Sequence, residues 1–564
     1  MGVEHGDVDR ATERKYERLS PFELKNELID LADGNLKHAA HAMINAGRGN
    51  PNWTSISARE AFYILGEFAV AEAKRNWDEF PGMAGMPDVA GIARRFDEFL
   101  TARAENGGVV LLREAVRYGT AQLSFDADQW VGELADAVHG DHYPVPDRML
   151  THVERVVHAY LDLSMGGAPQ GGWDLFATEG GTAAMCYLFD SCVVNGLLQP
   201  GDRIAIMTPI FTPYLEIPHL ARFHFDVLEL KASKMETDGE HAWQYSAEDI
   251  EKLADPAVKA LFLVNPSNPP SVMLDHATTT RIAEIAAKEN PNLTIITDDV
   301  YGTFVDGFRS LMSTAAANTI GVYSFSKYFG CTGWRLGVIA VARNNTFDDR
   351  IAALPERTRE ALARRYSSIA LRPAELKFID RMVADSRDVA LNHTAGLSTP
   401  QQVQMALFSL SELLDRDREH RRACQAIIAR RVGQLYGGLG LPVPNNPNAA
   451  NYYVELDLLM WVRGRWGDAF AEWLQQHYEP VDPVFRLAEH GSIVLLNGGG
   501  FDGPEWSVRV SMANLLQDSY ATIGQVLEQT MAEYHQEYLS RGAGAARSAP
   551  PSPWVRSPAP VSKK

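Results

Sequence analysis

Short runs of β-branched and other apolar residues, separated by helical patterns, constrain the fold of this 564-residue chain more than any other feature. The runs are Arg203–Met207, Ala260–Val264, Leu293–Thr297, Thr319–Tyr323 and Gly337–Val341. Strands that alternate with helices form βαβ units, so we expect a mainly parallel, buried sheet flanked by helices. In such sheets ligands bind beyond the carboxyl ends of the strands, and most of the candidate chemical residues below follow these runs.

The segment from Ser324 to Gly337 carries the most specific chemistry, with the pattern S-x-S-K-x-x-G-x-x-G-x-R-x-G. Lys327 lies between hydroxyl side chains and Arg335 in a glycine-rich turn. A lysine in this setting can form a Schiff base, while Ser324, Ser326 and Arg335 suit a phosphate dianion. Those are the requirements of pyridoxal 5′-phosphate. The alternative is an ordinary surface lysine in a loop.

This pattern closely resembles the cofactor-lysine segment of the fold-type I, aspartate-aminotransferase-like enzymes. The resemblance implies an α/β fold whose large domain, with a mainly parallel sheet, is joined by a smaller α+β domain. It also implies that Lys327 holds pyridoxal 5′-phosphate covalently and that Ser324, Ser326 and Arg335 cradle the phosphate. Once substrate displaces it, Lys327 becomes the base that moves protons between Cα and the cofactor's C4′.

Two glycine- and proline-rich motifs match the same family. Gly180-Gly181-Thr182 follows a short strand and opens a helix, where free backbone N–H groups can bind an anion. Its place matches the family's first phosphate loop, although such a triplet is more often only a turn. Asn265-Pro266-Ser267-Asn268-Pro269 resembles the family's N-P-x-N-P motif, in which Asn268 would hydrogen-bond the pyridine 3-oxygen. The family usually has glycine where this chain continues with Pro270-Ser271, and that departure leaves Asn268 in place.

Asp298-Asp299-Val300-Tyr301 follows the next predicted strand. A carboxylate that faces the pyridine nitrogen keeps this nitrogen protonated and makes the ring a better electron sink. The family's D-x-x-Y spacing assigns this role to Asp298 and places Tyr301 beside the 3-oxygen. Two adjacent aspartates are alternatively a metal or turn feature.

Three further assignments concern the substrate, the partner subunit and the cofactor ring. Arg509, within Trp506-Ser507-Val508-Arg509-Val510-Ser511, resembles the family arginine that clamps the substrate α-carboxylate, although a lone strand arginine is usually a surface residue. Tyr143 looks like the family tyrosine that reaches a neighbouring subunit's phosphate, which makes a homodimer the minimum active unit. Phe211 or Tyr214 could stack on the pyridine ring, and the sequence does not choose between them.

The loop Asn45-Ala46-Gly47-Arg48-Gly49-Asn50-Pro51-Asn52-Trp53 lies where the family has a substrate-facing glycine loop. An ordinary aminotransferase has a shorter loop there without an arginine. We therefore assign Arg48 to a second substrate carboxylate, with Gly49 and Asn268 as further substrate contacts. A solvated loop arginine is the alternative.

This loop, a long helical insertion and the overall length together resemble the bacterial aspartate 4-decarboxylases, across about residues 15 to 540. The resemblance implies conversion of L-aspartate to L-alanine and carbon dioxide, with side transamination of aspartate with a 2-oxo acid. It also implies a homo-oligomer larger than a dimer. Protonation of the substrate Cβ is assigned to Tyr143 or to a water. The alternative function is that of a plain class I aminotransferase acting on aspartate or another amino acid.

Bulk properties narrow the partners and the compartment. A net charge of −19 disfavours nucleic acid and anionic membrane surfaces as partners. A regulator of the aminotransferase-like type would need a basic helix-turn-helix segment, which the sequence lacks. Four cysteines without paired spacing, a charged N-terminus and no long apolar run predict a cytoplasmic protein without a membrane span.

The chain divides into five predicted parts. Residues 1–56 form an N-terminal arm and a helix that joins the small domain, with a capping box at Ser20-Pro21-Phe22-Glu23 that starts the helix. Residues 57–140 form a helical insertion, broken near Pro81-Gly82 and Gly107-Gly108, in which we expect an oligomer contact. Residues 141–387 form the large cofactor-binding domain and 388–541 the small domain, and 542–564 form a disordered tail.

Overall fold

The computed structural model describes residues 10–36, 43–236, 240–387 and 396–542. The predicted tail therefore lies outside the described residues except for Gly542, which ends the last helix, α21 (Ser519–Gly542). Within these ranges, no helix has both the length and the apolar character that crossing a membrane requires.

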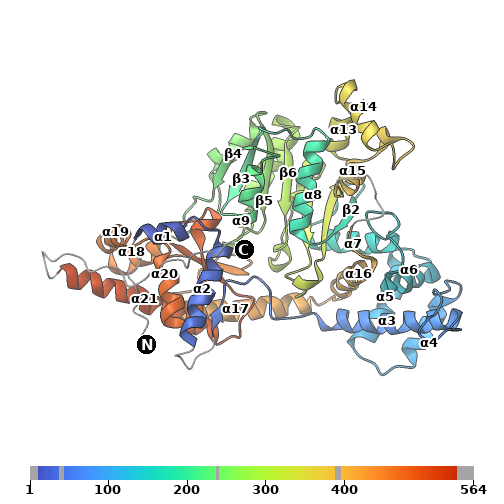
Figure 1. Ribbon diagram of the computed structural model, residues 1–564, viewed down its shortest axis with the longest axis horizontal. Helices are drawn as coiled ribbons and strands as arrows, with labels where there is room; N and C mark the ends of the chain where they lie inside the picture. The colour runs from blue at the N-terminus through green and yellow to red at the C-terminus, as the bar shows by residue number, and fades with distance from the viewer. Residues whose placement is uncertain (1–9, 37–42, 237–239, 388–395, 543–564) are drawn as a thin grey trace, which may run out of the picture.

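A seven-stranded sheet forms the centre of the molecule (Figure 1). Its order is β2-β8-β7-β6-β5-β3-β4, and only β8 runs antiparallel to its neighbours. The strands are β2 (Trp173–Thr178), β3 (Arg203–Thr208), β4 (Asp226–Lys231), β5 (Val258–Val264), β6 (Thr294–Asp298), β7 (Thr319–Ser324) and β8 (Gly337–Ala342). The predicted mainly parallel α/β sheet is confirmed. The strand β4 was not predicted, because this edge strand is half exposed and alternates polar with apolar residues.

Helices cover this sheet, and α8 packs against both β7 and β8. Those between residues 150 and 390 are α7 (Thr151–Ser164), α8 (Gly181–Val194), α9 (Thr212–Glu216), α10 (Ala247–Glu251), α11 (His276–Glu284), α12 (Leu311–Thr314), α13 (Thr346–Ala352), α14 (Glu356–Arg365) and α15 (Phe378–Asp385). The helix α8 begins where β2 ends, so its free N–H groups lie at the sheet edge that the parallel strands reach with their carboxyl ends.

The helical insertion consists of α3 (Ile56–Asn76), α4 (Ile92–Thr101), α5 (Gly107–Gln122) and α6 (Ala127–His139). The predicted break near Gly107-Gly108 is confirmed, since α4 ends at Thr101 and α5 begins at Gly107, behind an Asn106 cap that accepts from Val109 N at 2.9 Å. A Cβ added to Gly108 would lie 2.6 Å from Ala61 N on α3. The glycine at this start of α5 therefore also lets the backbones of α5 and α3 approach closely.

The C-terminal part surrounds a three-stranded antiparallel sheet of order β11-β12-β9. The strands are β9 (Tyr453–Asp457), β11 (Leu496–Asn497) and β12 (Ser507–Ser511). The helices are α16 (Thr399–Leu413), α17 (Glu419–Leu439), α18 (Leu458–Trp466), α19 (Asp468–His477) and α20 (Asp482–Gly491), followed by α21. The short strand β10 (Ile493–Val494), just before β11, lies outside this sheet and pairs with a strand of the N-terminal segment.

The N-terminal segment lies beside this C-terminal part (Figure 1). It comprises α1 (Arg10–Tyr16), α2 (Pro21–Leu36) and β1 (Ile44–Asn45), and β1 pairs in parallel with β10. The helix α2 begins at Pro21 as predicted, and Glu23 N donates to Ser20 Oγ at 3.3 Å. These contacts carry the loop after β1 back towards the edge of the large sheet.

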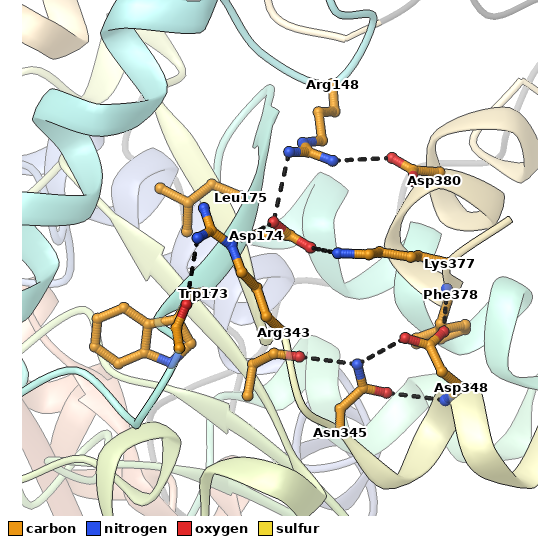
Figure 2. Close-up of polar contacts among 12 residues, drawn as sticks. Arg148, Trp173, Asp174, Leu175, Arg343, Asn345, Asp348, Lys377, Phe378 and Asp380 are labelled. Atoms are coloured by element: carbon orange, nitrogen blue, oxygen red, sulfur yellow. Dashed lines mark hydrogen bonds and ion pairs between the residues drawn. The ribbon is translucent and has the colours of Figure 1, made fainter.

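A cluster of charged residues attaches the edge strand β2 to its surroundings (Figure 2). Asp174 is only 4% exposed, and its carboxylate accepts from Lys377 Nζ at 2.6 Å and from Arg343 Nε at 2.9 Å. Arg148 lies 3.6 Å from the same carboxylate and also pairs with Asp380 at 3.2 Å. We call these five residues the Asp174 cluster: Asp174, Lys377, Arg343, Asp380 and Arg148. Its buried carboxylate meets three cations.

Candidate active site

A cavity of about 270 Å³ lies at the carboxyl ends of β5, β6 and β7, and we call it the Lys327 cavity. It brings together most of the residues that the sequence singled out. Those that line it are Gly49, Gly181, Thr182, Asn268, Asp298, Tyr301, Ser324, Ser326, Lys327 and Arg335. They come from segments nearly 290 residues apart in the chain, so tertiary folding alone makes them neighbours.

Lys327 follows β7 and points to the loop after β1. Its Nζ donates to Gly49 O at 3.0 Å, and no carboxylate in the described part of the chain forms an ion pair with it. The same Gly49 O accepts from Tyr452 Oη at 2.8 Å. The amine is therefore held by a neutral carbonyl, which leaves it able to bond covalently to an aldehyde.

Anion-binding groups gather beside this lysine. Ser324 Oγ donates to Ser326 Oγ at 2.9 Å, next to the N-terminus of α8. Among the described residues, Arg335 donates only to backbone carbonyls, those of Thr332 at 3.1 Å and Glu179 at 3.4 Å. Gly180 has φ +92°, and a Cβ there would lie 2.6 Å from Arg335 Nη2. Glycine at this position thus lets the guanidinium approach the helix start, where a phosphate would meet both.

Asp298 ends β6 and is 6% exposed. Burial raises its pKa to about 6, although hydrogen bonds from Tyr214 Oη (2.7 Å) and Val300 N (3.2 Å) and the charge of Lys327 act to lower it. The contact with Tyr214 could not be foreseen, because the two residues are 84 positions apart. Phe211 and Tyr214 both line the cavity, and the stacking role of either residue remains a prediction.

The neighbouring Asp299 faces a different environment. It accepts hydrogen bonds from Thr297 Oγ1 at 2.7 Å and from Ser310 Oγ. Burial raises its pKa to about 7, and those hydrogen bonds act against this rise. Asp299 therefore anchors the turn, while Asp298 lines the cavity.

Arg509 on β12 is 1% exposed, so it is not a surface residue. Its Nη1 donates to Asn268 Oδ1 at 3.2 Å and its Nη2 to Gly47 O at 3.1 Å, while Nε has no partner in the described structure. Glu455, its cross-strand neighbour, has a pKa raised to about 8 by burial and stays largely protonated at pH 7. Arg509 is thus a buried cation held by neutral groups, which suits a ligand carboxylate.

Four predicted residues do not line the cavity, and two of them, Gly180 and Arg509, lie beside its lining residues Arg335 and Asn268. Tyr143 is 64% exposed in this single chain, and Arg48 is exposed on the loop that carries Gly49. The role expected of Tyr143 concerns a second subunit, and both roles remain predictions. Conversely, Tyr453 lines the cavity but was missed, because a tyrosine on a small-domain strand gives no sequence signal for chemistry.

The fold and this cavity define a class of protein that the comparisons with known proteins also identify. The family model for class I and II aminotransferases matches residues 177–523. The chain therefore belongs to the class I and II aminotransferase family, and its cofactor is pyridoxal 5′-phosphate, as predicted.

A particular relative matches almost from end to end. The chain is 47% identical over 532 residues to the bifunctional aspartate aminotransferase and L-aspartate beta-decarboxylase of a Pseudomonas species, covering 94% of this chain and 99% of that protein.

Among solved structures, a double mutant of Thermus thermophilus aspartate aminotransferase shares the fold with a TM-score of 0.55 at 17% identity, covering 92% of this chain and 98% of that one. N-succinyldiaminopimelate aminotransferase of Mycobacterium tuberculosis gives 0.54 at 18% identity, with 93% and 99% covered.

Proposed function

We propose that this chain converts L-aspartate to L-alanine and carbon dioxide by β-decarboxylation, with side transamination of aspartate with a 2-oxo acid. The observation that carries the proposal is the end-to-end similarity to the bifunctional Pseudomonas enzyme. The Lys327 cavity supports it, because the lysine amine and an anion cradle line it and the buried guanidinium of Arg509 hydrogen-bonds the lining residue Asn268.

The residues present fit pyridoxal 5′-phosphate. Lys327 Nζ would hold its aldehyde carbon, and Asp298 would face the ring nitrogen. Asn268 and Tyr301 would flank the ring 3-oxygen. The phosphate would be held by the residues of the anion cradle, which are Gly180, Gly181, Thr182, Ser324, Ser326 and Arg335. When bound, the cofactor supplies an electron sink conjugated to the amino group of the substrate.

The side chains of this protein then orient aspartate and move its protons. Arg509 holds the α-carboxylate with its planar guanidinium, which fixes the orientation of the Cα–H bond. Lys327 removes the Cα proton and returns it later. Tyr214 Oη donates to Asp298 Oδ2 at 2.7 Å and so fixes the carboxyl that would face the cofactor ring.

The side-chain carboxylate has to leave, which limits how tightly it can be held. A bidentate arginine there would stabilise the ground state more than the charge-dispersed transition state and would slow decarboxylation. The exposure of Arg48 is consistent with a loose contact to this group. Exclusion of water from the cavity would favour alanine, whereas hydrolysis would release oxaloacetate.

The decisive experiment supplies aspartate and pyridoxal 5′-phosphate without any 2-oxo acid. We expect sustained release of carbon dioxide and alanine in equal amounts. A plain aminotransferase needs a 2-oxo acid acceptor for turnover, so stoichiometric oxaloacetate without alanine would reject the proposal in favour of that alternative.

We further propose a homodimer as the minimum unit, in which Tyr143 contributes to the partner's phosphate site, and a larger homo-oligomer built from dimers. Large apolar side chains are exposed on and beside α3, which supports an assembly contact in the helical insertion. They are Ile56, Tyr63, Val70, Trp77, Phe80 and Met83. The four cysteines are unpaired, which supports a reducing compartment such as the cytoplasm. Sedimentation analysis of the purified protein tests the assembly.

A further inference from the structure

Tyr453, the first residue of β9, shares the Lys327 cavity with the lysine. It is 2% exposed. A Cβ built on Gly49 would lie 2.3 Å from Tyr453 Oη and 3.1 Å from Lys327 Nζ. Both polar atoms therefore meet at the same point of the glycine loop to which we assign substrate contacts.

The surroundings of this phenol favour loss of its proton. The Arg509 guanidinium lies 4.2 Å from the centre of the Tyr453 ring, and Tyr301 Oη donates to Tyr453 Oη at 3.3 Å. Burial acts to raise the pKa of Tyr453, but the charges of Lys327 and Arg509 and the hydrogen bond from Tyr301 lower it below its ordinary value. The adjacent Tyr452 has its pKa raised instead, chiefly by burial.

We propose that Tyr453 is the acid that delivers the proton to the substrate Cβ, an inference that rests on the proposed function. Loss of the side-chain carboxylate breaks the Cβ–Cγ bond, and Cγ leaves as carbon dioxide. The electron pair of that bond stays with the rest of the substrate, and one proton must then bond to Cβ. Tyr453 donates this proton from Oη and becomes a phenolate.

The phenolate is stabilised by two groups already in place. Arg509 supplies positive charge, and Tyr301 donates a hydrogen bond. A proton from solvent restores the phenol, so the balance is aspartate plus one proton giving alanine plus carbon dioxide. The delivery of a proton by a positioned acid contributes about 10²- to 10⁴-fold to a rate.

Other tyrosine hydroxyls near the cavity are engaged elsewhere. Tyr452 donates to Gly49 O at 2.8 Å, and Tyr214 donates to Asp298 at 2.7 Å. Tyr301 donates to Tyr453 itself. Tyr453 accepts that bond, and its own O–H proton has no acceptor among the described residues.

The test is Tyr453→Phe in the pyridoxal-phosphate-loaded enzyme. We expect alanine formation from aspartate to fall by about 10²-fold or more, while transamination of aspartate with 2-oxoglutarate changes less than about 10-fold. Tyr245→Phe is the matched control. It removes another buried hydroxyl, bonded to Thr208 O at 3.3 Å, outside the cavity, and both activities should persist.

A titration of tyrosinate absorbance at 295 nm provides a readout independent of turnover. The difference between the wild type and Tyr453→Phe should show one tyrosine that ionises below pH 10, and Tyr245→Phe should retain that signal. The assignment would be overturned if this difference showed no tyrosine that ionises below pH 10. It would also be overturned if Tyr453→Phe lost both activities equally. If the wild-type enzyme itself made no alanine, the proposed function would fail, and this step with it. Alanine from the wild type and undiminished alanine from Tyr453→Phe would overturn the role of Tyr453 alone.

Discussion

The Asp174 cluster and the Lys327 cavity both bury charge, but they surround it differently. Asp174 contacts three cations within 3.6 Å, so its charge is compensated inside the fold (Figure 2). Arg509 and Asp298 are as deeply buried, yet their closest hydrogen-bond partners are amides, carbonyls and a phenol. A buried charge without an opposite partner costs stability. The first arrangement therefore attaches a strand, and the second keeps charge ready for a ligand.

Substitution of one lysine in each region, Lys327 or Lys377, should give the largest and most different effects on activity and stability. Lys327→Ala should abolish the visible absorbance of bound pyridoxal 5′-phosphate and lower alanine formation by at least about 10³-fold, because the covalent link and the proton carrier are both lost. Absorption spectra and product assays measure this effect.

Lys377→Ala is the control for that experiment. It removes a partner of Asp174 and should lower the thermal midpoint of unfolding while the visible band stays. Retention of the band in Lys327→Ala would refute the assignment of the cofactor lysine.

Arg509→Met should weaken the binding of aspartate with little loss of stability. A buried charged hydrogen bond that loses its partner costs about 2–5 kcal/mol, so we expect KM for aspartate to rise by about 10²-fold or more. The folded protein loses only an uncompensated cation, and exchange of a buried ion for an apolar side chain is often neutral or stabilising. Steady-state kinetics and thermal unfolding measure the two effects.

Arg148→Met in the Asp174 cluster is the contrast for Arg509. It leaves Glu154 and Asp380 without their guanidinium, and should therefore lower stability with KM unchanged. An unchanged KM in Arg509→Met would remove Arg509 from the substrate site.

The two buried aspartates should give the smallest effects, of opposite sign with pH. Hydrogen bonds from Lys377 and Arg343 lower the pKa of Asp174 despite its burial, so it stabilises the fold above the ordinary aspartate pKa and less as pH falls below it. The pKa of Asp298 is raised from 3.8 to about 6, so stability is lost as pH rises through that window. Asp174→Asn should therefore destabilise at pH 7, whereas Asp298→Asn should stabilise cofactor-free protein there by roughly 1–3 kcal/mol.

Urea unfolding at pH 7 and at pH 4 measures both aspartate variants. The stabilisation by Asp298→Asn should shrink at pH 4, where the wild-type carboxyl is already protonated. Loss of stability at pH 7 in Asp298→Asn would contradict the view that this carboxylate is kept at a cost to the fold.

Local patterns explain how far the sequence could predict this molecule. Residues of the cofactor motifs, among them Lys327, Asn268 and Asp298, follow predicted strands and meet in one cavity, because parallel strands bring their carboxyl ends to one edge. The edge strand β4 was missed because it lacks an apolar run, and Tyr453 was missed because a tyrosine on a strand gives no sequence signal for chemistry. Each miss arose where a partner in space, rather than neighbours in sequence, determines the residue.

The sequence by itself determined the parallel sheet, the cofactor lysine and the anion-binding turn, because strand periodicity and motif spacing are local properties of the chain. Tertiary structure alone decided that Tyr214 fixes Asp298, that Arg509 is buried among neutral groups, and that Tyr453 meets the lysine across the domains. Those relations depend on burial and on contacts between distant segments. Burial and neighbouring charges shift the pKa of a phenol or a carboxyl at the site, and both arise only when the chain folds.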